Sequence, residues 1–507
     1  MWDARAAKPF RCYRRPVTSW EPHEPIRARL RAERGRLERG GGATVALAYP
    51  SGYRAAMSSL GFQQIYKLIQ GSDRLSCARA FLPDGDAQVA PLTYEELRPL
   101  SHYPIVAFSV AYELELAGLV TMLERTGVPS LRDERADDAP FILAGGPLTF
   151  SNPLPLAAFA DAIVMGEAEE LVLPVLEAIS GAASKREALR ALAAMPHVFV
   201  PEHHGAQMPP VAKCDTALLP ASSAIRTPDT ELSDMFLIET ERGCSRACTY
   251  CVMRRSTNGG MRLVSKDTIL GTIPEDATRV GLVGAAVSDH PKIAEIVRTL
   301  AARGAEVGLS SLRPDRLSDD FVSALASAGY RTLTTAMDGP SERLRESLER
   351  RAKVKHLRRA AELARAHGMK RLKLYLMLGL PGETDADIDE CVSFVAELST
   401  VAPIALGIAP FCAKRNTPLD GQPFAGIDVV TARLDRLRRG LRGRAEVRST
   451  SAKWAWVEYV LAQGGVAEGR ALRTAALAGG SFAKYKAAFE ATLRDRPARR
   501  SLAIAPF

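Results

Sequence analysis

The chain has 507 residues, of which 47% are apolar, so it is long enough for two or three domains with large buried cores. Its formal net charge is +9, but no apolar stretch is long enough to cross a membrane and no apolar segment near residue 1 fits a signal peptide. Eight cysteines are too few for a small disulfide-stapled secreted domain, so we expect a cytoplasmic protein.

Basic residues concentrate at two places in the sequence. Residues 1–40 contain eleven Lys or Arg against five Asp or Glu, and residues 433–448 contain seven arginines. Such clusters can neutralise the phosphates of RNA or of an anionic substrate. They also occur as solvated surfaces of arginine-rich chains. We favour the solvated surface and keep RNA as an alternative partner.

After a basic, irregular leader over residues 1–42, the sequence predicts an α/β domain over residues 43–200. Continuous apolar runs indicate strands, and a period near 3.6 residues indicates helices between them. The predicted strands are 43–50, 105–110, 141–144 and 162–165, and the predicted helices are 55–69 and 114–126. This alternation is typical of a Rossmann-like, doubly wound parallel sheet, whose ligands lie beyond the carboxyl ends of the strands.

Three turns are expected to line that edge of the sheet, at residues 51–53, 145–147 and 166–168. Gly145 and Gly146 form a tight turn that permits a ligand to approach the backbone, although such turns serve any close approach. A linker rich in proline, histidine and small residues, over residues 201–234, then separates the first domain from the second.

A second βα alternation follows over residues 235–425. The predicted strands are 235–239, 279–283, 306–310, 332–336, 372–378 and 404–411. Six strands with intervening helices indicate a partial (β/α)6 barrel of the TIM type, with its chemistry at the carboxyl ends of the strands. Residues 426–507 are predicted to form a small helical region, in which aromatic residues such as Trp454, Trp456, Tyr459 and Phe482 serve mainly as packing.

The most informative segment directly follows the first of these strands. Cys244, Cys248 and Cys251 have the spacing C-x3-C-x2-C, with Tyr250 just before the third cysteine. Three thiolates on one loop can hold three irons of a [4Fe–4S] cluster and leave the fourth iron open. A structural zinc site would need a fourth Cys or His, and none lies close by in the sequence. Three unrelated buried cysteines are a further alternative.

These motifs together resemble the radical SAM superfamily, specifically a bacterial family with an N-terminal cobalamin-binding-like domain. The matching segments are Tyr49–Phe62, Leu143–Pro147, Gly166–Glu170, Arg242–Cys251, Ser310–Asp315, Ser341–Arg345, Leu378–Thr384, Ala413–Pro418 and Ser451–Glu458. The resemblance implies a [4Fe–4S] cluster on the three cysteines, S-adenosylmethionine (SAM) as its ligand, and an electron donor such as flavodoxin or ferredoxin. Tyr250 stands at the aromatic position of the family motif.

The same resemblance implies residues that contact SAM. The stretch after the second barrel strand, Gly284 and Ala285 with the next alanine, would hold the amino group of SAM. Ser310 and Arg313 would face its ribose or carboxylate. Asp338 stands where the family often has a glutamate, with a shorter reach. Turn capping and surface solvation are the alternative roles for these polar residues.

Cobalamin is also implied, and Gly145 and Gly146 would face it at the edge of the first sheet. However, the motif D-x-H-x-x-G, which supplies a histidine ligand to cobalt, is absent from the sequence. A bound cobalt would therefore lack that ligand, which favours exchange of a methyl group over its retention. The alternative is a cobalamin-free domain that serves as a scaffold or substrate platform.

We therefore expect an enzyme that cleaves SAM reductively, removes a hydrogen atom from its substrate and, with cobalamin, transfers a methyl group to an unactivated carbon. One alternative is a radical SAM enzyme that modifies RNA or the ribosome and has a non-cobalamin N-terminal domain. Another is a nonenzymatic Fe–S sensor that binds nucleic acid, which would need a fourth protein ligand. Cys412 is a candidate hydrogen donor or substrate contact, although a packing role is favoured.

Overall fold

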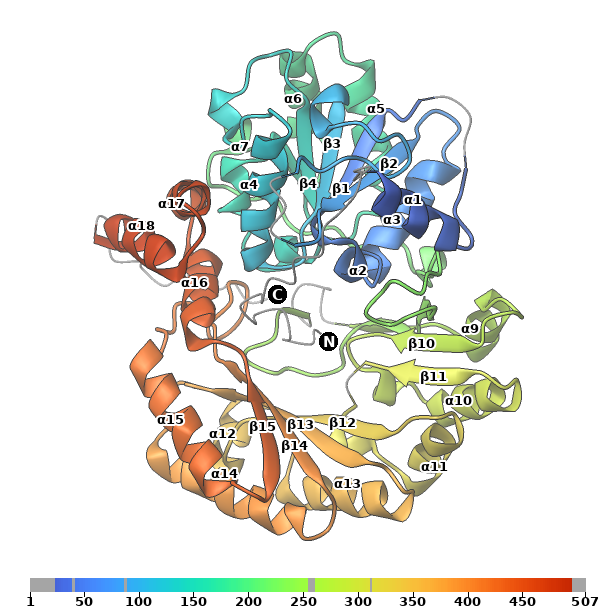
Figure 1. Ribbon diagram of the computed structural model, residues 1–507, viewed down its shortest axis with the longest axis vertical. Helices are drawn as coiled ribbons and strands as arrows, with labels where there is room; N and C mark the ends of the chain where they lie inside the picture. Colours follow the sequence, from blue (N-terminus) through green and yellow to red (C-terminus); the bar gives the residue numbers. More distant parts are fainter. Residues whose placement is uncertain (1–22, 39–41, 86–88, 254–259, 311, 495–507) are drawn as a thin grey trace, which may run out of the picture.

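In the computed structural model of this protein, the described residues are 23–38, 42–85, 89–253, 260–310 and 312–494. The chain forms an N-terminal α/β domain, drawn at the top of Figure 1, and an open ring of strands and helices, drawn below it. Helices α16 to α18 of the C-terminal region lie beside the upper domain, next to α4. The predicted α/β fold class is confirmed.

The N-terminal sheet has six strands in the order β2-β1-β3-β4-β5-β6, all parallel except β6. The strands are β1 (Val45–Gly52), β2 (Cys77–Leu82), β3 (Ile105–Ser109), β4 (Phe141–Gly145), β5 (Ala162–Val164) and β6 (Val198–Phe199). Four of them were predicted, whereas β2 was not, because Arg79 interrupts its apolar run. Arg79 is fully buried and donates to Glu33 Oε1 at 2.8 Å, so burial of that charge is compensated by an ion pair.

Two sets of helices cover the two faces of this sheet. One face packs against α3 (Leu60–Gly71), α5 (Val172–Gly181) and α6 (Lys185–Ala193), and the short helix α2 (Tyr53–Ala56) precedes α3. The other face packs against α4 (Leu116–Arg125) together with the C-terminal helices α16 (Ala452–Gln463), α17 (Val466–Leu477) and α18 (Phe482–Arg494). The C-terminal tail therefore completes the core of the first domain, and Trp454, Trp456, Tyr459 and Phe482 pack there.

The second domain holds its strands in two parallel sheets, with the orders β11-β10-β7 and β12-β13-β14-β15. The strands are β7 (Phe236–Glu239), β10 (Arg279–Val283), β11 (Glu306–Leu309), β12 (Thr332–Asp338), β13 (Arg371–Leu378), β14 (Ile404–Pro410) and β15 (Ala445–Ser449). An isolated bridge between Leu312, which follows β11, and Thr335 of β12 connects the two sheets. The six predicted barrel strands are thus confirmed.

Helices form the outer layer of the ring. They are α9 (Lys266–Thr272), α10 (Ile293–Ala302), α11 (Asp319–Ser327), α12 (Glu342–Ser347), α13 (Val354–Ala366), α14 (Asp385–Ser399) and α15 (Ile427–Gly440).

Three further elements lie in segments for which another structure was predicted. Strand β15 lies in the region predicted to be helical, because this short, charged edge strand has no local pattern and is held by pairing with β14. Helix α1 (Glu24–Ala32) lies in the leader predicted to be irregular, and α7 (Pro201–His204) lies in the predicted linker. Helix α1 is docked by Arg29, which donates to Asp229 Oδ2 at 2.6 Å.

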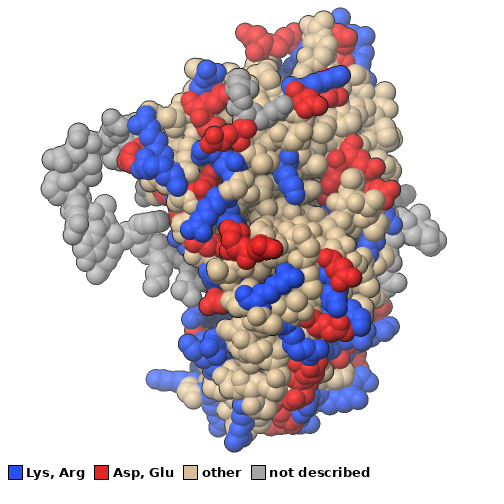
Figure 2. Space-filling model, turned by 90° about the vertical axis from the view of Figure 1, so that its right-hand side faces the viewer, with Lys and Arg blue, Asp and Glu red and all other residues tan. Residues whose placement is uncertain are grey.

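The basic cluster over residues 433–448 is partly neutralised by the helix beside it. Arg433 of α15 pairs with Glu383 at 2.9 Å, and Arg436 pairs with Asp389 of α14 at 2.6 Å. On the face shown in Figure 2, basic and acidic side chains are intermingled. Among the helices that the structure describes, none combines the length and the apolar character needed to span a membrane.

Candidate functional site

The three cysteines lie on one loop at the carboxyl end of β7. The loop begins after the short strand β8 (Glu241–Gly243), which pairs antiparallel with β9 (Met261–Leu263). Gly243 has a φ of +89°, so a residue with a side chain would be strained at this entry to the loop. The loop is anchored by Thr249, whose backbone N–H donates to Leu348 O at 3.1 Å. The cysteine loop therefore sits where the chemistry of such barrels is found.

The three thiols of the loop are free and at least partly buried. Cys244, Cys248 and Cys251 are not disulfide-bonded, and burial raises the pKa of each thiol, for Cys251 to about 11. Three thiols on one loop, with no fourth Cys or His close by in the sequence, fit a cluster that takes three protein ligands.

A network of charged side chains ties the cysteine loop to the ends of β10 and β11. Ser245 Oγ donates to Asp289 Oδ2 at 2.7 Å, and Arg246 forms an ion pair with Asp315. Arg313, which is 4% exposed, pairs with Asp289 and donates to Asp315 Oδ2 at 2.6 Å. Arg313 thus holds the loop in place, and its contact with SAM stays a prediction.

The residues expected to hold the amino group of SAM surround a buried carboxylate. Glu241 Oε1 accepts a hydrogen bond from the backbone N–H of Ala286 at 2.7 Å. A Cβ on Gly284 would lie 2.1 Å from the same oxygen, so a larger residue here would displace the Glu241 side chain. Ser310 Oγ donates to Gly284 O at 3.0 Å. The structure therefore brings Gly284, Ala286 and Ser310 to one place, and Ala285 lies in the turn between the first two.

Glu241 was not predicted as a site residue. It is fully buried, and its Oε2 has no hydrogen-bond partner among the described residues. Burial raises its pKa to about 8. A buried acceptor of this kind fits a ligand that carries N–H donors, such as the amino group of SAM. The sequence signal was a second acidic residue immediately before the arginine that begins the cysteine motif.

Asp338 adopts a φ of +64° at the carboxyl end of β12 and pairs with Arg350. Arg350 in turn interacts electrostatically with Cys248. Tyr250 packs into an apolar cluster with Leu344 and Phe411. Asp338 is thus engaged by an arginine that sequence reasoning missed, and the SAM contacts predicted for Asp338 and Tyr250 stay predictions.

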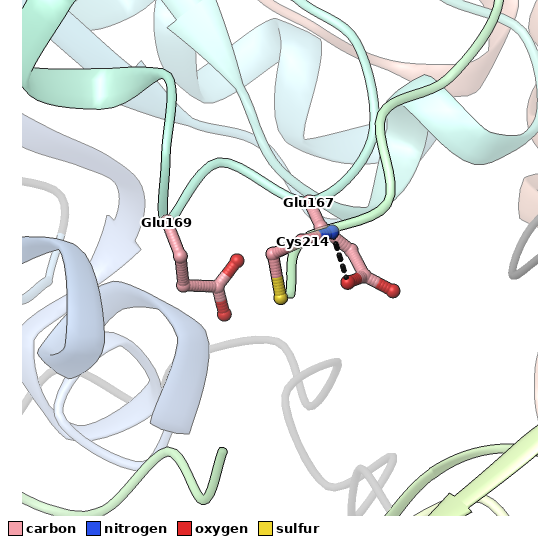
Figure 3. A group of neighbouring side chains, drawn as sticks. All are labelled: Glu167, Glu169 and Cys214. Atoms are coloured by element: carbon pink, nitrogen blue, oxygen red, sulfur yellow. Dashed lines mark hydrogen bonds between the residues drawn. The ribbon is translucent and has the colours of Figure 1, made fainter. Parts of the chain in front are cut away.

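The motif Gly166–Glu170 forms a bridge between the two domains. Glu167, Glu169 and Cys214 lie together with their ligand atoms within 4.8 Å of one another, as a single metal ion would require (Figure 3). However, Arg242 Nη1 lies 2.7 Å from Glu169 Oε1 and 3.3 Å from Cys214 Sγ.

A second arginine, Arg262 of β9, forms an ion pair with Glu167. Burial raises the pKa of Cys214 to about 12, so its thiol is protonated at neutral pH. Two guanidinium groups and a protonated thiol leave no place for a cation. The group is an ion-pair clamp between the first domain and the β8–β9 hairpin that precedes and follows the cysteine loop.

The carboxyl edge of the first sheet faces the end of β14. Lys414 Nζ lies 2.7 Å from Glu113 Oε2 and 2.7 Å from Glu458 Oε1, so it joins the first domain, the ring and α16. Asn416 Nδ2 donates to Phe150 O at 3.0 Å in the same contact. Glu113 is 2% exposed, and its Oε1 has no hydrogen-bond partner in the described part of the chain.

Gly145 ends β4, Gly146 follows it, and Cys412 follows β14. Gly146 has a φ of +104°, and a Cβ there would lie 2.7 Å from Val110 O, so the chain's own packing requires the turn. Cys412 Sγ donates to Ala455 O at 3.1 Å, and burial raises its pKa well above the usual range. A neutral, hydrogen-bonded thiol fits the packing role. The cobalamin contact of the two glycines stays a prediction.

Two family models match the chain. The model described as "Radical SAM proteins, N-terminal" matches residues 61–201, and the model of the radical SAM superfamily matches residues 238–395, which contain the cysteine loop. An uncharacterized protein of Methanocaldococcus jannaschii is 25% identical over 396 residues, which are 75% of this chain and 80% of the relative. A tRNA-2-methylthio-N(6)-dimethylallyladenosine synthase of Thermus thermophilus is 27% identical over 31% of this chain and 37% of its own length.

Among solved structures, that of the cobalamin-dependent SAM radical enzyme OxsB with aqua-cobalamin bound has a TM-score of 0.50 and 11% identity. The match covers 80% of this chain but only 58% of OxsB, so it supports the shared fold alone. The two family models together cover more than half of the chain, and the cysteine loop lies where they predict it. The chain therefore belongs to the radical SAM superfamily, whose cofactors are a [4Fe–4S] cluster and SAM.

Proposed function

We propose that this protein is a cobalamin-dependent radical SAM methyltransferase that acts on an unactivated carbon of its substrate. The observation that carries the proposal is the juxtaposition of two sheet edges. Lys414, after β14, pairs with Glu113, after β3, while Arg242, before the cysteine loop, pairs with Glu169, after β5. A ligand at the carboxyl edge of the first sheet would therefore face the cysteine loop.

In this proposal, Cys244, Cys248 and Cys251 hold the cluster. Glu241 and Ser310 lie beside the place where SAM would bind. When bound, a reduced cluster and SAM would supply the radical that removes a hydrogen atom from the substrate. Such a radical requires a dry site. Leu344, Leu348, Leu380, Phe411 and Ala413 form a buried apolar wall beside Tyr250. We expect flavodoxin or ferredoxin to supply the electron.

Two buried oxygens that lack hydrogen-bond partners among the described residues support a cofactor at the carboxyl edge of the first sheet. Glu113 Oε1 and Ser151 Oγ are buried without hydrogen-bond partners among the described residues, and both belong to segments that contact the loop at residues 414–416. The amide side chains of a corrin ring carry N–H donors that fit such acceptors. Cobalamin would supply the methyl group, and the sequence has no D-x-H-x-x-G motif to place a histidine at its cobalt.

The test is anaerobic reconstitution with iron, sulfide and hydroxocobalamin, followed by desalting. Iron, retained corrinoid and 5′-deoxyadenosine formed from SAM under dithionite are then quantified. Retained corrinoid together with SAM cleavage is the expected result. SAM cleavage without corrinoid would overturn the methyl-transfer proposal and favour an RNA-modifying enzyme, to which the barrel's likeness to a tRNA-modifying synthase also points. An intact cluster without SAM cleavage would favour a sensor.

A further inference from the structure

Arg350 is a buried cation placed directly against a cluster ligand. It lies in the loop between α12 and α13, and its side chain is 10% exposed. Its guanidinium forms an ion pair with Asp338 and interacts electrostatically with Cys248. The guanidinium is charged because arginine stays protonated in proteins, and the Asp338 carboxylate compensates the burial of that charge.

The backbone holds Arg350 in this position from both sides. The residues on either side of it, Glu349 and Arg351, have φ values of +52° and +59°, which cost free energy for residues with a side chain. The Arg350 N–H donates to Arg345 O at 3.0 Å. One residue before this strained stretch, Leu348 O accepts from Thr249 of the cysteine loop at 3.1 Å. A backbone hydrogen bond therefore joins the segment that carries Arg350 to the cysteine loop.

We propose that Arg350 and Asp338 together set the reduction potential of the cluster. On reduction, one electron from an external reductant converts [4Fe–4S]2+ to [4Fe–4S]+, and no other bond forms or breaks. The added negative charge is shared with the cysteine sulfurs. A guanidinium beside Cys248 would stabilise the reduced state, because positive charge near cluster sulfurs raises the potential. The Asp338 carboxylate has the opposite sign and offsets part of that effect.

Because Arg350 and Asp338 carry opposite charges, their replacement should shift the midpoint potential of the cluster in opposite directions. Arg350→Gln removes the cation and is expected to lower the midpoint potential. Asp338→Asn removes the anion and is expected to raise it, and asparagine tolerates the positive φ at this position. A merely structural role would make both variants lose iron or shift in the same direction. Arg350→Lys retains the charge, so its midpoint potential is expected to stay close to that of the unchanged protein.

The measurement is a redox titration of the reconstituted protein without SAM, followed by the electron paramagnetic resonance signal of [4Fe–4S]+, with iron content determined for each variant. For Arg350→Gln we expect the ratio of reduced to oxidised cluster at a fixed potential to fall about tenfold, which is about 59 mV for one electron. The matched control is Arg351→Gln, because Arg351 is the exposed neighbour with the same charge and a positive φ.

Opposite shifts in Arg350→Gln and Asp338→Asn, with no shift in the control, support the proposal. Equal potentials in all variants overturn it, as do shifts of the same sign. If Arg350→Gln fails to assemble a cluster, Asp338→Asn decides alone, since an unchanged or lower potential in that variant contradicts the proposal. The readout is independent of substrate and of cobalamin, so it does not depend on the proposed methyl transfer.

Discussion

Arg242 and Glu169 form an ion pair with a separation of 2.7 Å across the contact between the two domains. Arg242 lies two residues before Cys244, and Glu169 lies in the turn after β5 of the N-terminal sheet. Glu239 and Glu167 also pair with Arg242, so one guanidinium compensates three carboxylates. The position of the cysteine loop therefore depends on the N-terminal domain as well as on the barrel.

Replacement of Arg242 by glutamine should destabilise the protein strongly. The side chains of Arg242 and Glu169 are 14% and 9% exposed, so the variant leaves buried carboxylates without a cation. We expect the free energy of unfolding to fall by about 3–5 kcal/mol, measured by urea denaturation. Arg279→Gln is the control, since its pair with Glu306 is exposed and should contribute under about 1 kcal/mol. Equal losses in both variants would contradict a special role for the clamp.

Single serine variants of the cluster cysteines should lose iron and SAM cleavage. Each of Cys244, Cys248 and Cys251 is expected to be required, because each supplies one ligand to the cluster. Cys412→Ser should retain iron and cleavage, because the serine hydroxyl can keep the hydrogen bond to Ala455 O. Iron analysis and 5′-deoxyadenosine formation under dithionite check both expectations. Loss of cleavage in Cys412→Ser, with iron retained, would instead assign that thiol a catalytic role.

The buried carboxyl of Glu115 should make stability depend on pH. Burial raises its pKa from 4.5 to about 7, against hydrogen bonds from Ala111 N–H and other donors. The folded state therefore keeps a proton at pH values where the unfolded state has lost it. The contribution of this proton to the free energy of unfolding is fully present below pH 4.5 and is lost as the pH rises through about 7. The loss amounts to about 3 kcal/mol at most, at about 1.4 kcal/mol per unit of pKa.

Glu115→Gln removes this titrating group. The difference in the free energy of unfolding between the two proteins, measured by urea denaturation at several pH values, should change in favour of the variant as the pH rises. A difference that is independent of pH over that range would show that Glu115 has an ordinary pKa in the folded protein.

Two arginines of α15 should differ sharply in their effect on stability. Arg433 pairs with Glu383, whose side chain is fully buried, whereas Arg439 is exposed. Arg433→Gln leaves a buried carboxylate without its cation and should lower the free energy of unfolding by about 3 kcal/mol. Arg439→Gln should change it by less than about 0.5 kcal/mol. Thermal and urea unfolding of both variants check this, and similar values for the two would refute the role assigned to Arg433.

The sequence by itself determined the parts of this protein that depend on local pattern. Apolar runs and turns placed β1, β3, β4, β5 and the first six barrel strands, because such strands are buried on both faces and read as continuous apolar segments. The spacing of Cys244, Cys248 and Cys251 predicted the cluster, because its ligands lie within one loop. The resemblance drawn from the motifs identified the superfamily that the family models show.

Only the tertiary structure decided which charged side chains meet. Strand β2 contains a buried arginine, and its partner Glu33 lies 46 residues away, so no local pattern predicted it. Arg350 reaches Cys248 only after β12 and α12 are packed, and Lys414 reaches Glu113 over 301 residues of sequence. The C-terminal helices cover the N-terminal sheet for the same reason. Ion pairs and core contacts between distant segments depend on how the chain folds back on itself, which periodicity and spacing do not encode.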